Sequence, residues 1–224
     1  MIRHLQYRRH FILSAGILGL AGVCAPAAWA QAPASSAPGA PAILVLGDSL
    51  SAEYGLARGA GWVALLEKRL QEEKIGRRVV NASVSGETTS GGRSRLAALL
   101  TQHKPAVVVI ELGGNDALRG LPLKNTEENL SAMTDAAQKA GAKVLLVGMQ
   151  VPPNYGADYA NRFAGLFTTV AQAKKVAVVP FFLKGVADGP DPTRLFQADR
   201  IHPRAEAHPQ MLANVWPELK KLLR

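Results

Sequence analysis

Two short segments carry residue types that could cleave an acyl bond. Ser49 follows an apolar run at residues 43–46, and Asp199 lies three residues before His202. At this spacing a carboxylate can accept a hydrogen bond from the N–H of one imidazole nitrogen and fix the tautomer, which leaves the other nitrogen to activate a serine hydroxyl. The pattern therefore indicates nucleophilic catalysis, with Ser49 as nucleophile, His202 as base and Asp199 as the orienting acid.

Helix capping is the competing interpretation of both segments. Asp48, Ser49 or Ser51 could cap a helix that follows the first apolar run, and capping is the commoner role of an isolated Asp-Ser pair. In the second segment, the carboxylate or the imidazole could cap a helix that has Pro203 at its first position. Capping and catalysis can also coexist.

Few histidines are available as the base. Of the five, His4 and His10 fall in an N-terminal segment that we expect to be removed. His103 stands at a predicted helix end, where it would interact with the terminal carbonyls. His208 stands on the predicted last helix, where we expect a solvated position. Only His202 has a carboxylate at triad spacing.

Acyl transfer also needs hydrogen-bond donors where negative charge develops on oxygen. Residues 81–86 end in Gly86, whose N–H can approach a ligand closely, and residues 112–116 include the amide side chain of Asn115. Taken singly, Gly86 is typical of a tight turn, and Asn115 with its neighbour Asp116 is typical of a helix cap. Together with the two segments above, they supply every part that serine acyl transfer requires.

These segments resemble the four sequence blocks of the GDSL, or SGNH, hydrolase superfamily. The resemblance is to its branch of exported acyl thioesterase I, lysophospholipase and arylesterase enzymes, and it spans about residues 42–222. The blocks stand here at residues 47–52, 81–89, 111–116 and 199–203.

The resemblance implies a role for each of five residues. Ser49 would be the nucleophile, His202 the base and Asp199 its orienting partner. The oxyanion hole would consist of the backbone N–H groups of Ser49 and Gly86 and the side chain of Asn115.

Two positions depart from common forms of the family pattern. Glu53 and Arg200 stand where the family often has glycine. Neither change removes a catalytic atom, but each adds a charged side chain near the rim of the site and restricts the local backbone. We therefore expect these two residues to affect substrate preference.

Strand ends must meet to bring the four segments together. Short apolar runs without polar alternation, typical of parallel strands buried on both faces, recur between longer amphipathic segments. We expect strands at residues 43–46, 79–82, 106–112, 143–149 and 176–181. We expect helices at residues 62–71, 93–102, 126–139 and 157–173, and a last one after Pro203. This alternation predicts an α/β fold, a three-layer α/β/α flavodoxin-like (SGNH hydrolase) domain on a five-stranded parallel sheet, with its site beyond the carboxyl ends of the strands.

The first thirty residues are typical of a signal peptide. They contain three arginines and no acid, an apolar run at residues 11–23 and a small-x-small pattern ending at Ala30. We expect cleavage near Ala30, a Pro/Ala/Ser-rich tether at residues 31–41 and one hydrolase domain at residues 42–224. The mature protein would be periplasmic or secreted. The Arg8-Arg9 pair leaves both the general and the twin-arginine export routes open.

Charge and cysteine content exclude several other classes of function. Loss of the three leader arginines lowers the net charge from +9 to +6, and the single cysteine, Cys24, leaves with them. A disulfide, a thiol nucleophile and a Cys-based metal site are therefore excluded, and we expect no metal and no cofactor. Basic pairs are scattered without interleaved aromatic residues, so we expect no nucleic-acid partner. The remaining positive charge favours transient contact with an anionic phospholipid surface. The sequence makes no prediction of oligomeric state.

Apolar residues after the third and fourth strands suggest the walls of a substrate crevice. We expect an acyl ester or lipid as substrate, namely a medium- to long-chain acyl ester or thioester, a lysophospholipid or an aryl ester. The predicted substrate contacts are Leu50, Leu118, Leu121, Val151, Pro152, Tyr155 and Ile201. A carbohydrate O-acetyl esterase is the alternative enzyme, and a non-catalytic lipid carrier is the non-enzymatic one.

Overall fold

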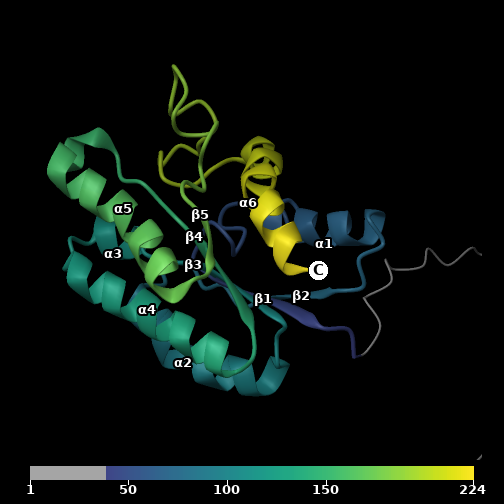
Figure 1. Ribbon diagram of the computed structural model, residues 1–224. Coiled ribbons are helices and arrows are strands. Elements are labelled where there is room, and N and C mark those ends of the chain that lie inside the picture. Colours follow the sequence, from purple (N-terminus) through teal and green to yellow (C-terminus); the bar gives the residue numbers. More distant parts are fainter. Residues whose placement is uncertain (1–38) are drawn as a thin grey trace, which may run out of the picture. The chain divides into compact units, whose positions relative to one another are not determined.

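The computed structural model describes residues 39–224, whose centre is a five-stranded, all-parallel sheet (Figure 1). The strands are β1 (Ala42–Gly47), β2 (Arg78–Asn81), β3 (Val107–Glu111), β4 (Lys143–Val147) and β5 (Ala177–Val179). Their spatial order is β2-β1-β3-β4-β5, the order of flavodoxin-like doubly wound sheets. The five predicted strands are confirmed. The predicted signal peptide and most of the predicted tether lie outside the described residues.

Helices cover both faces of the sheet. Helices α1 and α6 pack together on one face, while α2, α4 and α5 pack side by side on the other (Figure 1). The helices are α1 (Trp62–Glu72), α2 (Thr89–His103), α3 (Gly114–Leu118), α4 (Leu123–Lys139), α5 (Ala157–Lys174) and α6 (His208–Leu222). Two short 3₁₀ helices are η1 (Pro153–Tyr155) and η2 (Ala205–Ala207). The predicted three-layer α/β/α arrangement is confirmed.

Burial follows the position of each strand in the sheet. Every residue of β1 and β3 is buried, whereas β2 and β5 at the two edges are only partly buried. A strand with a neighbour on each side and a helix layer on each face can be apolar along its whole length. The near-continuous runs of Val, Leu and Ile therefore favour the centre of the sheet for β1 and β3.

The sequence pattern missed part of α2 and all of α3. Helix α2 begins at Thr89, four residues before its predicted start, because Gly91 and Gly92 are weak helix formers. A Cβ atom on Gly92 would clash with the side chain of Leu112, so glycine is needed where α2 approaches the sheet. Helix α3, with five residues, is too short to show a helical periodicity.

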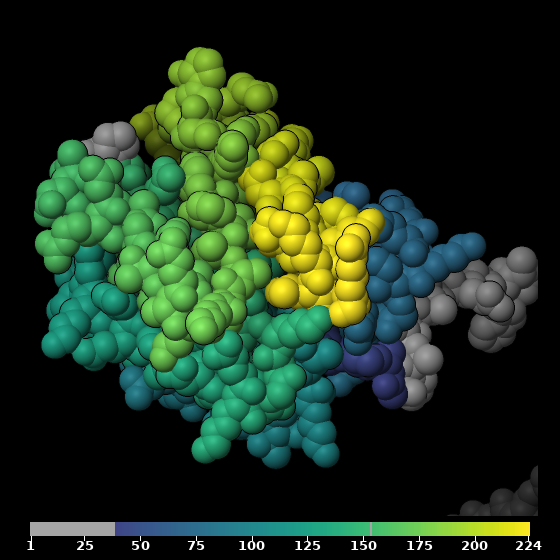
Figure 2. All heavy atoms as spheres, viewed as in Figure 1, coloured from purple at the N-terminus to yellow at the C-terminus, as the bar shows by residue number. Residues whose placement is uncertain are grey.

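The carboxyl ends of the strands bring distant segments to one edge of the sheet. The chain leaves β1 towards β2 and then crosses back to β3, so the direction of winding reverses between β1 and β3. Crevices at such switch points are the usual ligand sites of open α/β sheets. Residues 180–207, after β5, adjoin α6 on the surface, as yellow-green and yellow in Figure 2. No helix within residues 39–224 is long and apolar enough to cross a membrane.

Candidate active site

The structure brings Ser49, His202 and Asp199 into one hydrogen-bonded row. The Oγ atom of Ser49 lies 2.9 Å from Nε2 of His202, and Nδ1 of His202 lies 2.7 Å from Oδ2 of Asp199. Ser49 follows β1, whereas the other two residues belong to the long segment after β5. This arrangement allows the imidazole to take the serine proton while the carboxylate holds the imidazole in the required tautomer.

The loop that carries the base is built around Asp199. Its Oδ1 atom accepts the backbone N–H groups of Ile201 at 2.9 Å and of His202 at 3.0 Å. The hydrogen bond from the His202 N–H, followed by that from the His202 side chain, lowers the pKa of Asp199 to about 2, against an opposing contribution from desolvation. The loop is closed by Gln197, whose N–H donates to the His202 carbonyl at 2.8 Å.

The helix-capping interpretation of this loop is wrong. Helix α6 begins at His208, and a 3₁₀ turn at Ala205–Ala207 precedes it, so Pro203 is not a first helical residue. Asp199 instead caps its own tight turn. Arg200 in that turn has φ of 58°, in the left-handed region that favours glycine. The family's usual glycine at this position is explained by that backbone conformation.

The turn after β1 is likewise not a helix cap, because α1 does not begin until Trp62. The Oδ1 atom of Asp48 accepts the Leu50 N–H at 3.0 Å, which holds the turn that presents Ser49. Glu53 has φ of 60°, again where the family often has glycine. Its carboxylate accepts the Gly61 N–H at 2.8 Å and so closes the loop ahead of α1.

The predicted oxyanion donors lie at the ends of three neighbouring strands. Asn115 donates through Nδ2 to Oδ2 of Asp48 at 3.0 Å, which fixes its carboxamide and leaves its second N–H for a ligand. Gly86 has φ of 77°, and its carbonyl accepts from the Arg119 guanidinium at 2.9 Å. Within residues 39–224, the backbone N–H groups of Ser49 and Gly86 donate to no acceptor.

Asp116 connects two of these segments. Its Oδ2 atom accepts the Thr89 N–H at 2.9 Å, and its Oδ1 atom accepts from the Thr89 hydroxyl at 2.5 Å. Asp116 thereby caps the start of α2, which follows Gly86, rather than the helix on which it lies. The interpretation that Asn115 or Asp116 caps the next helix is wrong, because α3 and α4 have no side-chain cap and Asp116 bonds to the start of the preceding helix α2.

Burial dominates the electrostatics around Asp48. Desolvation raises its pKa to about 6, although the Leu50 N–H and the Asn115 amide oppose the shift. Glu111 at the end of β3 is also buried, and desolvation together with the charge of Asp48 raises its pKa well above the usual range. Two carboxyl groups behind the nucleophile are therefore driven towards their neutral forms.

Exposed apolar side chains lie on the segments at this edge of the sheet. Within residues 39–224, the large hydrophobic side chains that are exposed all belong to segments beyond the carboxyl ends of the strands. They are Tyr54, Val84, Leu118, Leu121, Tyr155 and Ile201. Four of them were predicted as substrate contacts, but Tyr54 and Val84 were not. The rings of Tyr54 and His202 lie against each other with a centroid distance of 4.3 Å. In the sequence, only the position of Tyr54 close after residues 47–52 could have indicated this contact.

The other predicted substrate contacts occupy different surroundings. Leu50 packs in the hydrophobic core, Val151 is half-buried against it and Pro152 is exposed. Leu121 also lines a polar cavity of about 240 Å³ with Asp116 and residues at the starts of α2 and α4.

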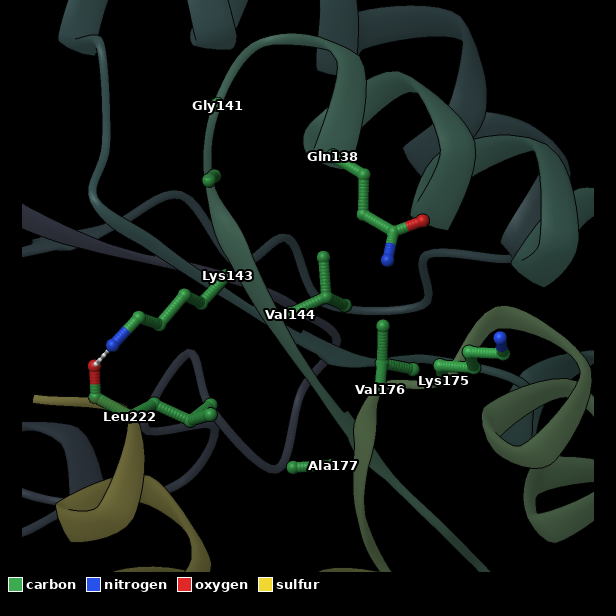
Figure 3. Close-up of a pocket in the computed structure, with 9 residues that line it drawn as sticks. Gln138, Gly141, Lys143, Val144, Lys175, Val176, Ala177 and Leu222 are labelled. Carbon is green, nitrogen blue, oxygen red and sulfur yellow. Dashed lines mark hydrogen bonds between the residues drawn. The ribbon is translucent and has the colours of Figure 1, made fainter.

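A larger cavity, of about 320 Å³, lies at the opposite end of the sheet (Figure 3). It is lined by the amino-terminal ends of β4 and β5, including Lys143, Val144 and Val176, and by Leu222. Lys143 donates through Nζ to the Leu222 carbonyl at 3.0 Å. Ser49, His202 and Asp199 do not line this cavity, so the cavity is not part of the candidate active site although it is the larger of the two.

The prediction of a solvated position for His208 is wrong. This residue is only 2% exposed, and its Nδ1 atom accepts the backbone N–H of Trp62 at 3.0 Å. Desolvation lowers its pKa, which favours the neutral imidazole. Within residues 39–224, no three His, Cys, Asp or Glu side chains lie close enough together to hold a metal ion.

Comparisons with known proteins find relatives of this chain in sequence and in fold. Residues 45–209 match the sequence profile of the GDSL-like Lipase/Acylhydrolase family. The chain is 54% identical over 181 residues to Esterase TesA of Pseudomonas aeruginosa, which covers 81% of this chain and 89% of that protein. It is 41% identical to the Thioesterase 1/protease 1/lysophospholipase L1 of Escherichia coli K12, over 77% of this chain and 80% of that protein. Among solved structures, the psychrotrophic esterase EstA from Pseudoalteromonas sp., inhibited by monoethylphosphonate, has a TM-score of 0.75 at 41% identity and covers 81% of this chain and 98% of that chain.

Proposed function

The chain belongs to the GDSL-like lipase/acylhydrolase family and is a serine esterase, and from this premise we propose that Ser49, His202 and Asp199 perform the hydrolysis. The observation that carries the proposal is the continuous row from the Ser49 hydroxyl through both nitrogens of the His202 imidazole to the Asp199 carboxylate. A helix cap or a structural turn requires no such row.

In the first half of the reaction, the Oγ atom of Ser49 attacks the acyl carbonyl carbon while Nε2 of His202 takes the serine proton. The carbonyl oxygen becomes an oxyanion, which accepts hydrogen bonds from the Ser49 and Gly86 N–H groups and from the Asn115 side chain. The intermediate collapses as His202 returns the proton to the leaving alcohol or thiol, and the acyl group remains on Ser49.

In the second half, water attacks the acyl-enzyme and His202 takes one of its protons. A second tetrahedral intermediate then collapses, and the proton returns to the Ser49 Oγ atom as the carboxylic acid leaves. The Asp199 carboxylate stays ionised throughout and stabilises the imidazolium, in keeping with its lowered pKa.

The substrate side of the proposal rests on the exposed apolar residues beside Ser49. Leu118, Tyr155 and Ile201 lie on three different segments around the strand ends and offer an open apolar surface to an acyl chain. We therefore infer medium- to long-chain acyl esters or thioesters, lysophospholipids or aryl esters as substrates. The names of the bacterial relatives, esterase and thioesterase/lysophospholipase, agree with this range.

Export and surface contact complete the proposal. A signal peptide at residues 1–30 would release the domain to the periplasm or the medium, away from cytosolic acyl-CoA. The net charge of the mature chain would favour transient contact with anionic phospholipid, weakened by salt.

The test is hydrolysis of p-nitrophenyl esters of increasing chain length by the mature protein and by its Ser49→Ala variant. We expect preference for octanoyl over acetyl esters, and a loss of about 10⁶ in kcat for the variant, because the three residues act as a unit. Near-normal turnover by a folded Ser49→Ala protein would refute the catalytic proposal. Preference for acetyl esters would favour the carbohydrate deacetylase alternative.

A further inference from the structure

A buried chain of hydrogen bonds lies behind the nucleophile, and the mechanism above does not use it. The Oε2 atom of Glu111 accepts from the Ser51 hydroxyl at 2.6 Å. The Ser51 Oγ atom in turn accepts from the indole N–H of Trp62 at 3.0 Å. The backbone N–H of Trp62 donates to Nδ1 of His208 at 3.0 Å. The chain thus connects the end of β3, the turn after β1, the start of α1 and the start of α6.

Both ends of this chain adjoin catalytic segments. The N–H of Asp48, the residue before the nucleophile, lies 3.4 Å from the same Oε2 atom of Glu111. At the other end, His208 lies six residues after His202, and the short 3₁₀ helix η2 leads from the His202 loop to the start of α6. The two halves of the Ser49 and His202 pair are therefore joined through the interior as well as across the active site.

Burial of polar side chains at these positions lowers the stability of the fold unless hydrogen bonds compensate for the lost contact with water. Ser51, Glu111 and His208 are each 2% exposed or less, and burial of a carboxyl group and an imidazole disfavours folding unless their bonds are satisfied. The packing is also tight. A Cβ atom on Gly47 would lie 2.7 Å from the Ser51 Oγ atom and 2.9 Å from the Glu111 Oε2 atom, so a larger residue would push this contact apart.

The neutral forms of the two end groups suit this arrangement. Desolvation raises the pKa of Glu111 and lowers the pKa of His208. The negative charge of Glu53 opposes the shift at His208. A neutral carboxylic acid accepts from Ser51 through one oxygen, and a neutral imidazole accepts from Trp62 through Nδ1. The amide of glutamine offers the same acceptor without any charge.

We propose that Glu111 and His208 are positioning residues of the esterase, which hold the turn with Ser49 and the loop with His202 in register through Ser51 and Trp62. The proposal rests on the catalytic roles proposed above for Ser49 and His202. Neither positioning residue would touch the substrate, so their loss would reduce the rate of attack by Ser49 more than the affinity for an ester.

Paired substitutions separate the acceptor from the charge. Glu111→Gln and His208→Gln keep an acceptor, whereas Glu111→Leu and His208→Leu remove it, and Trp62→Phe breaks a single bond at Ser51. Thr134→Val is the matched control, because it removes a buried hydrogen bond of 2.8 Å to the Leu130 carbonyl on α4, away from the chain. For each protein, kcat and KM on p-nitrophenyl butyrate, the rate of labelling by a fluorophosphonate and the melting temperature would be measured.

We expect the leucine variants and Trp62→Phe to lower kcat and the labelling rate together by about tenfold or more, with KM within about twofold. The glutamine variants should stay within about threefold of the parent protein, because the acceptor is kept. Thr134→Val should lower only the melting temperature. Folded leucine variants with the kcat of Thr134→Val, or glutamine variants as slow as the leucine variants, would overturn the proposal.

Two further results keep the test decisive. If a leucine variant does not fold, Trp62→Phe tests the proposal instead, through the same expected loss in kcat and labelling rate with little change in KM. An inactive Ser49→Ala protein beside fully active Glu111→Leu and Trp62→Phe proteins would overturn this inference alone, whereas an active Ser49→Ala protein would refute the proposed function itself.

Discussion

Asp48 and Asp199 are the same residue type on the two sides of one active site, and their surroundings shift their pKa values in opposite directions. Asp48 is buried in the turn after β1, where desolvation raises its pKa to about 6. Asp199 stands on the loop that carries His202, where hydrogen bonds from that residue lower its pKa to about 2. Both accept a backbone N–H from their own turn, so burial is what separates them.

The difference separates two ways of positioning a catalytic group. The Ser49 turn is held from behind by buried polar contacts, and burial there disfavours the charged form of Asp48. The base loop is exposed to solvent and is held by local hydrogen bonds to an ionised carboxylate, the charge state that stabilises an imidazolium. Contacts in the protein core therefore position the Ser49 turn, whereas hydrogen bonds within its own turn position the His202 loop.

Apart from the loss of Ser49 itself, the largest effect is expected at the loop that carries His202. Asp199→Asn keeps an oxygen for the turn but loses the charge and the correct tautomer, so kcat on p-nitrophenyl butyrate should fall by about 10⁴. Asp191→Asn, in the same connection after β5, is the control, because its carboxylate bonds only locally to Thr193. Equal activity of the two variants would show that Asp199 serves the turn alone.

A smaller effect is expected on the nucleophile side. Asn115→Ala removes one proposed oxyanion donor and should cost about 10² to 10³ in kcat with the fold intact. Gln172→Ala, which removes an exposed amide on α5, should leave kcat unchanged. If both variants keep full turnover, the oxyanion hole does not include Asn115.

The pH dependence of stability should have opposite signs for the two aspartates. The stability from Asp199 is present above its unfolded pKa near 4 and is lost as the pH falls towards 2, so Asp199→Asn should destabilise the protein more at pH 6 than at pH 2.5. Buried Asp48 costs stability as the pH rises from about 4 through 6. Asp48→Asn should therefore become more stable relative to the parent protein over that range, by up to about 3 kcal/mol. Urea unfolding at several pH values measures both, and parallel curves for the two variants would contradict the comparison.

The smallest effect concerns the backbone of the base loop. Arg200 has φ of 58°, whereas Arg204, four residues later, has φ of −79°. Arg200→Gly should therefore leave the free energy of unfolding unchanged or raise it by less than about 1 kcal/mol, while Arg204→Gly should lower it by about 0.5–1 kcal/mol. Thermal unfolding decides, and a clear loss of stability in Arg200→Gly would show that its side chain stabilises the loop.

The sequence predicted those features that depend on local pattern. Runs of Val, Leu and Ile predicted the five strands, and strand ends followed by Ser49, Gly86 and Asn115 predicted that these three residues would lie at one edge of the sheet. The carboxylate spacing before His202 predicted a contact that the structure shows at 2.7 Å. These features succeed because each needs only a few consecutive residues and a known strand order.

The features that were missed depend on long-range contacts. His208 was expected in solvent, yet it accepts a bond from Trp62, far away in the sequence. Tyr54 lies against His202 because the loop after β1 meets the segment after β5 there. Asp116 caps α2 rather than its own helix. None of these contacts leaves a periodic or spaced pattern in a single sequence.

The most direct test of the central claim is a crystal structure of the mature protein after reaction with a phosphonate ester. The account predicts one covalent bond to the Ser49 Oγ atom, with the phosphonyl oxygen accepting from the Ser49 and Gly86 N–H groups and from the Asn115 Nδ2 atom. An adduct on another residue, or a phosphonyl oxygen turned away from all three donors, would contradict it.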